Sequence, residues 1–453
     1  MAVRIGNGQG FWGDNVDAPV ELLRGGPIDY IGMDYLAEVT LSIMMRQKLD
    51  PKTGYARDFI GFVRRVLPEL KERNVRIIAN AGGLNPRACR ERLFEVAREL
   101  GVSGVRIGVV EGDDVLPRLA ELMEAGHELR NMETGEPLAP LVERVTSANA
   151  YLGAFPVAEA LRQDALIVVC GRVTDPALTL APMIHEFGWG REDWDLLAAG
   201  TVAGHIVECG AQCTGGNFSR FWEVPDLWNV GYPIVEASSD GTFTVTKHEG
   251  TGGMVTVDTV SEQLVYEMGD PADYVTPDVV ADFTSIRLEQ EGPDRVRVSG
   301  VRGRERTPFL KISASYLHGY KASGQITVSG PRAIAKARLA AETVWKRLER
   351  AGVDFPDEAR TEELVGLGAC LPDILPAPAD PPEVVLRLGV HDEDREKVDR
   401  FGKEIAPLVT AGPPGVTGFA GGRPKPQEIV AFWPALLARD AIEGRIQVSV
   451  EEV

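Results

Sequence analysis

The segment Ala165-Leu166-Ile167-Val168-Val169-Cys170-Gly171-Arg172-Val173-Thr174-Asp175-Pro176 carries most of the fold prediction. Its first six residues are apolar and rich in β-branched side chains, which is typical of a strand buried on both faces. Asp175 followed by Pro176 then predicts a helix start, with aspartate as the N-cap and proline as the first helical residue. A buried strand, a short loop and a helix in this order indicate a parallel sheet covered by helices.

The same pattern recurs on the N-terminal side of this segment. Short apolar runs predict further strands, and apolar residues at helical spacing predict helices between them. We therefore expect an α/β fold class, with residues 1–225 forming a doubly wound α/β domain around a mostly parallel sheet. The strands are expected at residues 3–5, 28–31, 75–80, 104–110 and 165–170, and the helices at residues 57–73 and 87–100.

The character of the sequence changes near Pro225. Alternating segments separated by turn signals follow, and these predict antiparallel strands. We expect residues 226–453 to form a second, α+β domain with antiparallel strands and a loop-rich tail. Apolar residues at helical spacing predict helices at residues 331–352 and 394–408 within it.

Charge and composition exclude several classes of function. The chain has 453 residues, with 48 basic and 67 acidic side chains, and a net charge of −19. A surface this acidic does not suit sequence-independent binding of nucleic acid or anionic membranes, which both require basic faces. The sequence shows no signal-peptide core and no apolar run of spanning length, so we expect a cytoplasmic protein. Its five cysteines are odd in number and sparse, which favours free thiols. A homo-oligomer is also expected.

Glycine-rich loops should gather beyond the carboxyl ends of the strands, where ligands bind in open parallel sheets. The first loop holds a GxGxxG pattern at Gly8, Gly10 and Gly13, which leaves open a nicotinamide or flavin cofactor or simply a tight turn. The second runs from Asn80 to Pro86. Its Gly82 and Gly83 let the backbone approach an anionic ligand, and Asn85 is expected to cap the next helix. We assign Gly8, Gly10, Asn80, Gly82, Gly83 and Asn85 as candidate substrate-binding residues.

The third loop follows the decisive strand and carries Arg172 and Asp175. A guanidinium at the edge of the sheet suits a carboxylate or a phosphate, so Arg172 is a candidate substrate anchor. Asp175 is a helix cap by position and also a candidate catalytic residue. Cys170 ends the core strand and is expected to be a packed thiol rather than a nucleophile.

A predicted helix at residues 194–212 concentrates polar groups. His205, Glu208, Cys209 and Gln212 fall at i, i+3, i+4 and i+7 and therefore share one face. This stripe is compatible with acid–base catalysis, with metal binding or with a satisfied buried polar cluster. His205 and Glu208 are candidate catalytic residues, and we assign no metal ligands. The glycine-rich end of the segment adds Gly215, Gly216 and Asn217 as candidate substrate contacts.

A fourth loop contains His248, a candidate acid or base beside a glycine-rich turn. Its neighbours Glu249, Gly250 and Gly252 are candidate substrate contacts. Glu38, which follows the second expected strand, is an alternative carboxylate base.

Taken together, these motifs resemble one known family. The strings Ile5–Asp14, Ala79–Pro86, Cys170–Asp175, Glu208–Asn217 and Gly412–Gly418, together with the His248 loop, are similar to the acyclic terpene utilisation (AtuA) family over nearly the whole chain. The resemblance implies a role in the catabolism of branched acyclic acyl-CoA thioesters. It also implies cleavage of a 3-hydroxy-3-isohexenylglutaryl-CoA-type substrate. Many members of that family continue into a small ferredoxin-like C-terminal module. We expect this chain to lack that module, so that a small partner subunit could supply it.

The expected function is therefore that of a C–C lyase acting on a 3-hydroxy-3-substituted glutaryl-CoA-like thioester. Retro-aldol cleavage needs a base for the hydroxyl group and a cationic or N–H-rich site for the enolate. His248 or His205 could serve as the base, and Arg172 with the amides of Gly82 and Gly83 could hold the enolate. An acyl-CoA hydratase or dehydratase, and a non-catalytic subunit that binds acyl-CoA or a partner, remain alternatives. Coenzyme A is expected only as part of the substrate, and any further cofactor is unknown.

Overall fold

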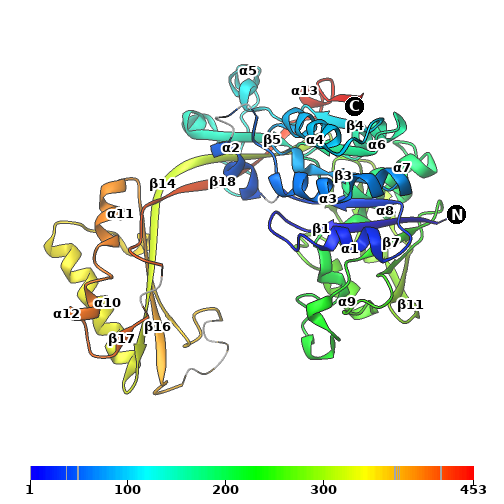
Figure 1. Ribbon diagram of the computed structural model, residues 1–453. Coiled ribbons are helices and arrows are strands. Elements are labelled where there is room, and N and C mark those ends of the chain that lie inside the picture. Colours follow the sequence, from blue (N-terminus) through cyan, green and yellow to red (C-terminus); the bar gives the residue numbers. More distant parts are fainter. Residues whose placement is uncertain are drawn as a thin grey trace. The chain divides into compact units, whose positions relative to one another are not determined.

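The computed structural model describes residues 2–36, 38–47, 50, 52–371, 374, 376, 378–418 and 421–453. The chain divides into two compact units (Figure 1). Unit 1 contains Met1–Ser315 and Phe432–Val453, and unit 2 contains Tyr316–Ala431. The boundary therefore lies about ninety residues beyond position 225, where the turn-rich composition had suggested it.

Unit 1 is built on a ten-stranded sheet whose centre is parallel. The central strands lie in the order β1-β2-β3-β6-β4, and each is parallel to its neighbours. This confirms the doubly wound α/β fold expected from residues 165–176, which contain β6, the strand between β3 and β4 in the sheet. The bounds are β1 Val3–Gln9, β2 Tyr30–Met33, β3 Arg76–Ala79, β4 Arg106–Glu111 and β6 Ile167–Cys170.

Antiparallel strands extend this sheet on both edges. Strand β7 pairs antiparallel with β1, and β8, β12 and β11 follow it outward. On the other edge, β19 pairs antiparallel with β4. The turn-rich segment after Pro225 thus continues the first sheet rather than opening a new domain, because β7 pairs edge to edge with β1 and the later strands pair outward from β7. The bounds are β7 Ile234–Ala237, β8 Phe243–Thr246, β11 Arg287–Gly292, β12 Arg295–Ser299 and β19 Gln447–Glu452.

Helices cover both faces of the parallel centre. Ile107 of β4 belongs to the core formed with α1, α3 and α4, whereas a Cβ at its neighbour Gly108 would lie 3.0 Å from Ala160 of α6. Adjacent strand residues face opposite sides of a sheet, so α6 lies on the face away from α4. The bounds are α1 Ala18–Gly25, α3 Arg57–Arg73, α4 Pro86–Leu100, α6 Phe155–Arg162, α7 Ala177–Phe187 and α8 Trp194–Val207.

A small antiparallel sheet, β13-β10-β9, packs beside α8. It comes from the segment between β8 and β14 and brings Tyr274 to the polar face of that helix. The remaining elements of the described chain are α2 Glu38–Gln47, α5 Leu119–Glu124, β5 Val145–Ala150, α9 Val257–Leu264, β9 Tyr274–Val275, β10 Val280–Asp282, β13 Arg302–Arg304, β18 Gln427–Ala438 and α13 Asp440–Glu443.

Unit 2 has the strand–helix–strand–strand–helix–strand order of a ferredoxin-like unit. Its strands lie in the order β15-β16-β14-β17, and all neighbours are antiparallel. Numbered along the chain, this is the order 2-3-1-4 of the split βαβ motif. The rings of Trp345 and Phe401 stack with centroids 6.0 Å apart, so α10 and α11 pack together. The bounds are β14 Phe309–Ser329, α10 Ala333–Arg350, β15 Arg360–Val365, β16 Glu383–Asp392, α11 Arg395–Gly402, α12 Leu408–Ala411 and β17 Val416–Thr417.

A ferredoxin-like topology is therefore present within this chain, a feature that we expected it to lack. The sequence pattern had indicated only an antiparallel α+β region, because β17 has two residues and leaves no periodic signal. No helix in the described part of the chain combines the length and the apolar character that crossing a bilayer requires.

Candidate active site

The carboxyl ends of the parallel strands present a continuous set of polar side chains. Asp34 follows β2, Asn80 follows β3, Arg172 follows β6 and Asp113 follows β4. All four are buried. Because neighbouring parallel strands end at one edge of the sheet, these side chains gather there.

Arg172 is the centre of this group. Its side chain is 2% exposed, and its guanidinium donates to the Leu36 carbonyl and to the Asp175 carboxylate. It also lies over the Tyr151 ring, with Cζ 4.3 Å from the centroid. The side chain of Asp175 is 38% exposed. Arg172 therefore lies beneath Asp175 and holds it in place, rather than facing solvent as the expected substrate anchor.

Asp34 and Asn80 form a second layer around the arginine. Asn80 Nδ2 donates to Asp34 Oδ1 over 2.7 Å, and the Leu36 amide donates to the same oxygen over 2.8 Å. Burial raises the pKa of Asp34 well above its usual range, Asp175 acts in the same direction, and Arg172 opposes both. The side chain of Asn80 is thus used inside the protein, where it positions Asp34.

His205 lies on the last turn of α8, and Glu208 is the C-cap residue of that helix. His205 Nδ1 is 3.2 Å from Glu208 Oε1, and the two side chains are 2% and 13% exposed. Tyr274 Oη lies 3.4 Å from the same histidine nitrogen. His205 Nε2 and Glu208 Oε2 have no hydrogen-bond partner among the described residues. Buried polar atoms are nearly always paired, so two such atoms in one pair make it a candidate functional site.

The pKa of each member of the pair is raised from its ordinary value. Burial raises the pKa of Glu208 to about 7, although His205 pulls it down. Burial alone would lower the pKa of His205, but the carboxylate of Glu208 leaves it raised. A carboxyl group with a pKa near the working pH can both accept and return a proton, which is the property required of a general acid–base catalyst.

Close backbone approach brings this pair to the edge of the sheet. A Cβ at Gly204 would lie 2.5 Å from Pro176 Cα, so only glycine lets α8 touch the loop after β6. A Cβ at Gly10 would lie 2.9 Å from the carbonyl carbon of Cys209, which sets the loop after β1 against the end of α8. Asp175 consequently acts on Glu208 and raises its pKa further. The structure thus brings together Arg172, Asp175, His205, Glu208, Asn80 and Gly10.

The predicted helix at residues 194–212 ends earlier than its pattern suggested. Helix α8 stops at Val207, and Gln212 lies in the following 3-10 turn, Gly210–Thr214. Burial raises the pKa of Cys209 to about 12. A thiol in this state is a poor nucleophile, because the thiolate is the reactive form.

The Asn80–Pro86 loop lies at the same edge but serves the fold. Asn85 caps α4 by accepting a hydrogen bond from the Ala88 amide over 3.2 Å. A Cβ at Gly82 would lie 2.5 Å from the Cys170 carbonyl oxygen, and the Gly83 amide donates to the Asn80 carbonyl. The Gly83 N–H, expected to bind an enolate, is therefore already used.

The GxGxxG pattern does not form a dinucleotide loop. Gly8 lies inside β1, which ends at Gln9, and α1 begins only at Ala18. A dinucleotide fingerprint needs the helix to start at the glycines, so that its N-terminus meets the pyrophosphate. Instead, a Cβ at Gly8 would lie 2.7 Å from the Cβ of Pro19, which explains the glycine by packing.

His248 and its neighbours lie apart from the Arg172 group. The His248 Nε2 atom is 2.9 Å from the Leu22 carbonyl oxygen of α1, and burial lowers the pKa of this histidine. Glu249 and Gly250 are exposed next to it.

Gly252 hydrogen-bonds through its amide to the Asn229 carbonyl. The Gly215-Gly216-Asn217 turn packs close to this loop, since a Cβ at Gly215 would lie 3.6 Å from the Met254 amide nitrogen. These residues are not joined to the His205–Glu208 pair by any hydrogen bond of the described structure. Glu38 begins α2, and its side chain lies outside the described part of the chain.

Several members of the site were not among the predicted residues. Asp34 and Asp113 could have been found, because each comes directly after a parallel strand. Asn149 donates to Asp113 over 2.8 Å and has an unpartnered Oδ1 atom, yet it comes from β5 and carries no motif. Tyr151 and Tyr274 reach the site from segments far from the glycine-rich loops, so nothing local in the sequence marks them.

No group of three or more histidine, cysteine, aspartate and glutamate side chains in the described residues is arranged to hold a metal ion.

Comparison with known proteins gives one match. The family model described as acyclic terpene utilisation family protein AtuA matches residues 3–448. The comparisons with curated proteins and with solved structures each returned no match. The family model covers both compact units and every loop of the site described above. The chain therefore belongs to the acyclic terpene utilisation family AtuA.

Proposed function

We propose that this protein is a C–C lyase that cleaves a branched 3-hydroxy acyl-CoA thioester of the 3-hydroxy-3-substituted glutaryl type. Membership of the acyclic terpene utilisation family supports a branched acyclic substrate. The observation that carries the catalytic part is the buried His205–Glu208 pair, which has two unpartnered polar atoms and lies beside Asp175 at the carboxyl edge of the sheet.

The proposed reaction is a retro-aldol cleavage. Glu208, as the carboxylate, removes the proton from the tertiary hydroxyl group, and the bond between C2 and C3 breaks. The electron pair of that bond moves into the thioester, which becomes an enolate, while C3 becomes a ketone. Protonated Glu208 then returns the proton to C2, and the products are a 3-oxo acid and acetyl-CoA. The same carboxyl group serves both steps, which a pKa of about 7 allows.

The other residues of the site have supporting roles in this proposal. His205 stabilises the ionised form of Glu208 through its ring nitrogen 3.2 Å away. Arg172 is a positioning residue, since its guanidinium is buried and holds Asp175. Asp175 is the more exposed carboxylate and is available to contact a hydroxyl group of the substrate. His248 is given no role, because its ring nitrogen hydrogen-bonds the Leu22 carbonyl.

The proposal is tested by mass spectrometry of the purified chain incubated with a panel of 3-hydroxy-3-substituted glutaryl-CoA and 2-enoyl-CoA thioesters. Splitting of a thioester into an acetyl thioester and a 3-oxo acid supports a lyase. Gain or loss of one water by the intact thioester replaces the lyase with a hydratase or dehydratase that uses the same groups. An unchanged panel overturns catalysis by the isolated chain and favours a subunit that needs a partner.

A further inference from the structure

A pocket lies in unit 1, and neither His205 nor Glu208 lines it. Its volume is about 520 Å³, within the range of roughly 300–1,000 Å³ that small-molecule sites occupy. Apolar side chains, among them Leu152, Phe155 and Trp189, form one part of the wall. Arg162, Arg191, Arg306 and Arg439 form the polar part, together with Glu159, Asp278 and Glu443.

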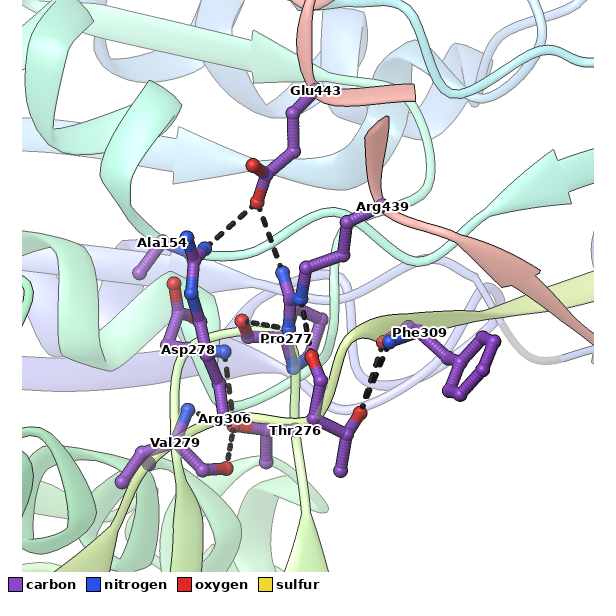
Figure 2. A network of polar contacts seen from close by, with 10 residues as sticks. Ala154, Thr276, Pro277, Asp278, Val279, Arg306, Phe309, Arg439 and Glu443 are labelled. Carbon is purple, nitrogen blue, oxygen red and sulfur yellow. Dashed lines mark hydrogen bonds and ion pairs between the residues drawn. The ribbon is translucent and has the colours of Figure 1, made fainter. Parts of the chain in front are cut away.

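Two of these arginines share a single carboxylate. Arg306 Nη1 and Arg439 Nη1 lie 2.7 Å and 3.1 Å from the same oxygen, Oε1 of Glu443 (Figure 2). The other donors of Arg439 are used by the Thr307 and Pro277 carbonyls, each over 2.6 Å, which fixes its position. Two positive charges therefore face one negative charge. Burial lowers the pKa of Arg439, and Arg306 acts in the same direction.

Arg191 adds a further positive charge, which helps to lower the pKa of Asp278. Its Cζ lies 4.2 Å from the centroid of the Phe155 ring, and the side chain makes no hydrogen bond or ion pair with the described residues. Arg162, by contrast, is paired with Glu159 over 2.7 Å. Guanidinium groups that are held by packing and keep free donors are suited to bind carboxylate or phosphate groups.

The remaining carboxyl group of the pocket, that of Asp278, is buried and partly satisfied. Its Oδ2 atom accepts a hydrogen bond from the Ala154 amide over 2.8 Å. Burial raises the pKa of Asp278, although Arg439, Arg191 and Arg306 act in the opposite direction. With four arginines and three carboxylic residues in its wall, the pocket is locally cationic in a chain whose net charge is −19.

We propose that this pocket binds the carboxylate or phosphate group of an amphipathic organic anion. Arg191 and Arg306 bind the anionic group, Arg439 and Glu443 hold Arg306 in place, and Phe155 and Trp189 contact the hydrocarbon part. The free donors, the shared carboxylate and the apolar wall together carry this assignment.

The pocket shares a wall with the catalytic edge. Leu152 lines the pocket, and its amide donates to the Arg172 carbonyl over 3.1 Å, while its carbonyl accepts from the Thr174 amide over 2.8 Å. These are the residues that precede Asp175. One layer of backbone hydrogen bonds therefore separates the proposed anion site from the loop that carries Asp175.

Isothermal titration calorimetry with octanoate, coenzyme A and sodium phosphate tests the proposal on the full chain. Octanoate supplies a carboxylate with an apolar chain, whereas coenzyme A and phosphate supply phosphoryl groups. The variants are Arg191→Gln and Arg306→Gln. The matched control is Arg287→Gln, an exposed arginine on β11, the strand at the opposite edge of the sheet from β19. Glu208→Gln separates this binding from the proposed catalysis.

Wild-type protein should bind octanoate, coenzyme A or both, and Arg191→Gln should weaken that binding about tenfold or more, because charged hydrogen bonds are lost. Arg287→Gln and Glu208→Gln should bind as the wild type does. Loss of octanoate binding in Arg191→Gln identifies a carboxylate site, and loss of coenzyme A and phosphate binding identifies a phosphoryl site. The proposal is overturned if none of the three probes binds, or if Arg191→Gln keeps the wild-type affinity. Arg191 is exposed, so this variant remains decisive even if Arg306→Gln fails to fold.

Discussion

Replacement of Arg172 by methionine should destabilise unit 1 by about 3 kcal/mol. The substitution keeps much of the aliphatic stem but removes the guanidinium that donates to Leu36 and Asp175. Breaking a buried ion pair from one side costs roughly 3–5 kcal/mol. Asp175 is 38% exposed, so water can solvate the carboxylate left behind, which places the expected loss at the low end.

The loss should also depend on pH. Arg172 lowers the pKa of buried Asp34, so in the methionine variant that carboxyl group should hold its proton to a still higher pH. A carboxyl group with a raised pKa in the folded state binds protons more tightly there than in the unfolded chain. Its contribution is therefore present at low pH and is lost as the pH rises through the raised value. The difference between wild type and variant should be larger at pH 8 than at pH 5.5.

Urea unfolding at the two pH values measures both effects, provided that the slope with denaturant is unchanged. Arg295→Met is the control, because its side chain is 41% exposed and its ion pair with Glu236 is worth only ~0–1 kcal/mol. A loss in Arg172→Met no larger than in the control, or a difference that shrinks as the pH rises, would refute the buried role assigned to Arg172.

Two further predictions concern the same site. Gly204→Ala should lower the free energy of unfolding by about 1–3 kcal/mol, because the added Cβ overpacks α8 against Pro176. Gly444→Ala is the control and should be near neutral, because its Cβ would meet nothing within 4 Å. Thermal unfolding compares the two variants, and equal melting points would contradict the close approach of α8 to Pro176. Turnover should fall as the pH drops below about 7, because the base Glu208 becomes protonated there. A pH–rate profile measures this dependence. A rate that rises toward pH 5 would argue against Glu208 as the base.

The sequence was sufficient for the parallel centre of unit 1. Strands buried on both faces leave long apolar runs, so β6 was predictable from local pattern. The helix after β6 was predictable too, but Pro176 is its N-cap residue and Asp175 does not cap it, since the Asp175 carboxylate pairs with Arg172. The antiparallel extension was not. Strands β7 and β8 have four residues each, and the pairing of β7 with β1 joins segments more than two hundred residues apart.

The site was predictable where it follows from chain topology. Two segments beside the carboxyl edge supply the predicted site residues that the structure brings together. The loop after β6 carries Arg172 and Asp175, and the C-terminal end of α8 carries His205 and Glu208. The sequence did not show which of these side chains would be buried, since nothing in the local pattern indicated that Arg172 would lie beneath Asp175. His248 lies beside a glycine-rich turn, which resembles a site in sequence, but its ring nitrogen hydrogen-bonds a carbonyl of α1.

The most direct test of the account compares the rates of thioester cleavage by wild type, Glu208→Gln and Glu289→Gln. Glutamine preserves the size of Glu208 but cannot accept the hydroxyl proton, and Glu289 is an exposed carboxylate on β11. We predict a loss of about 100-fold or more for Glu208→Gln, with melting behaviour like that of the wild type and with Glu289→Gln fully active. Cleavage by Glu208→Gln at the wild-type rate would contradict the assignment of this site.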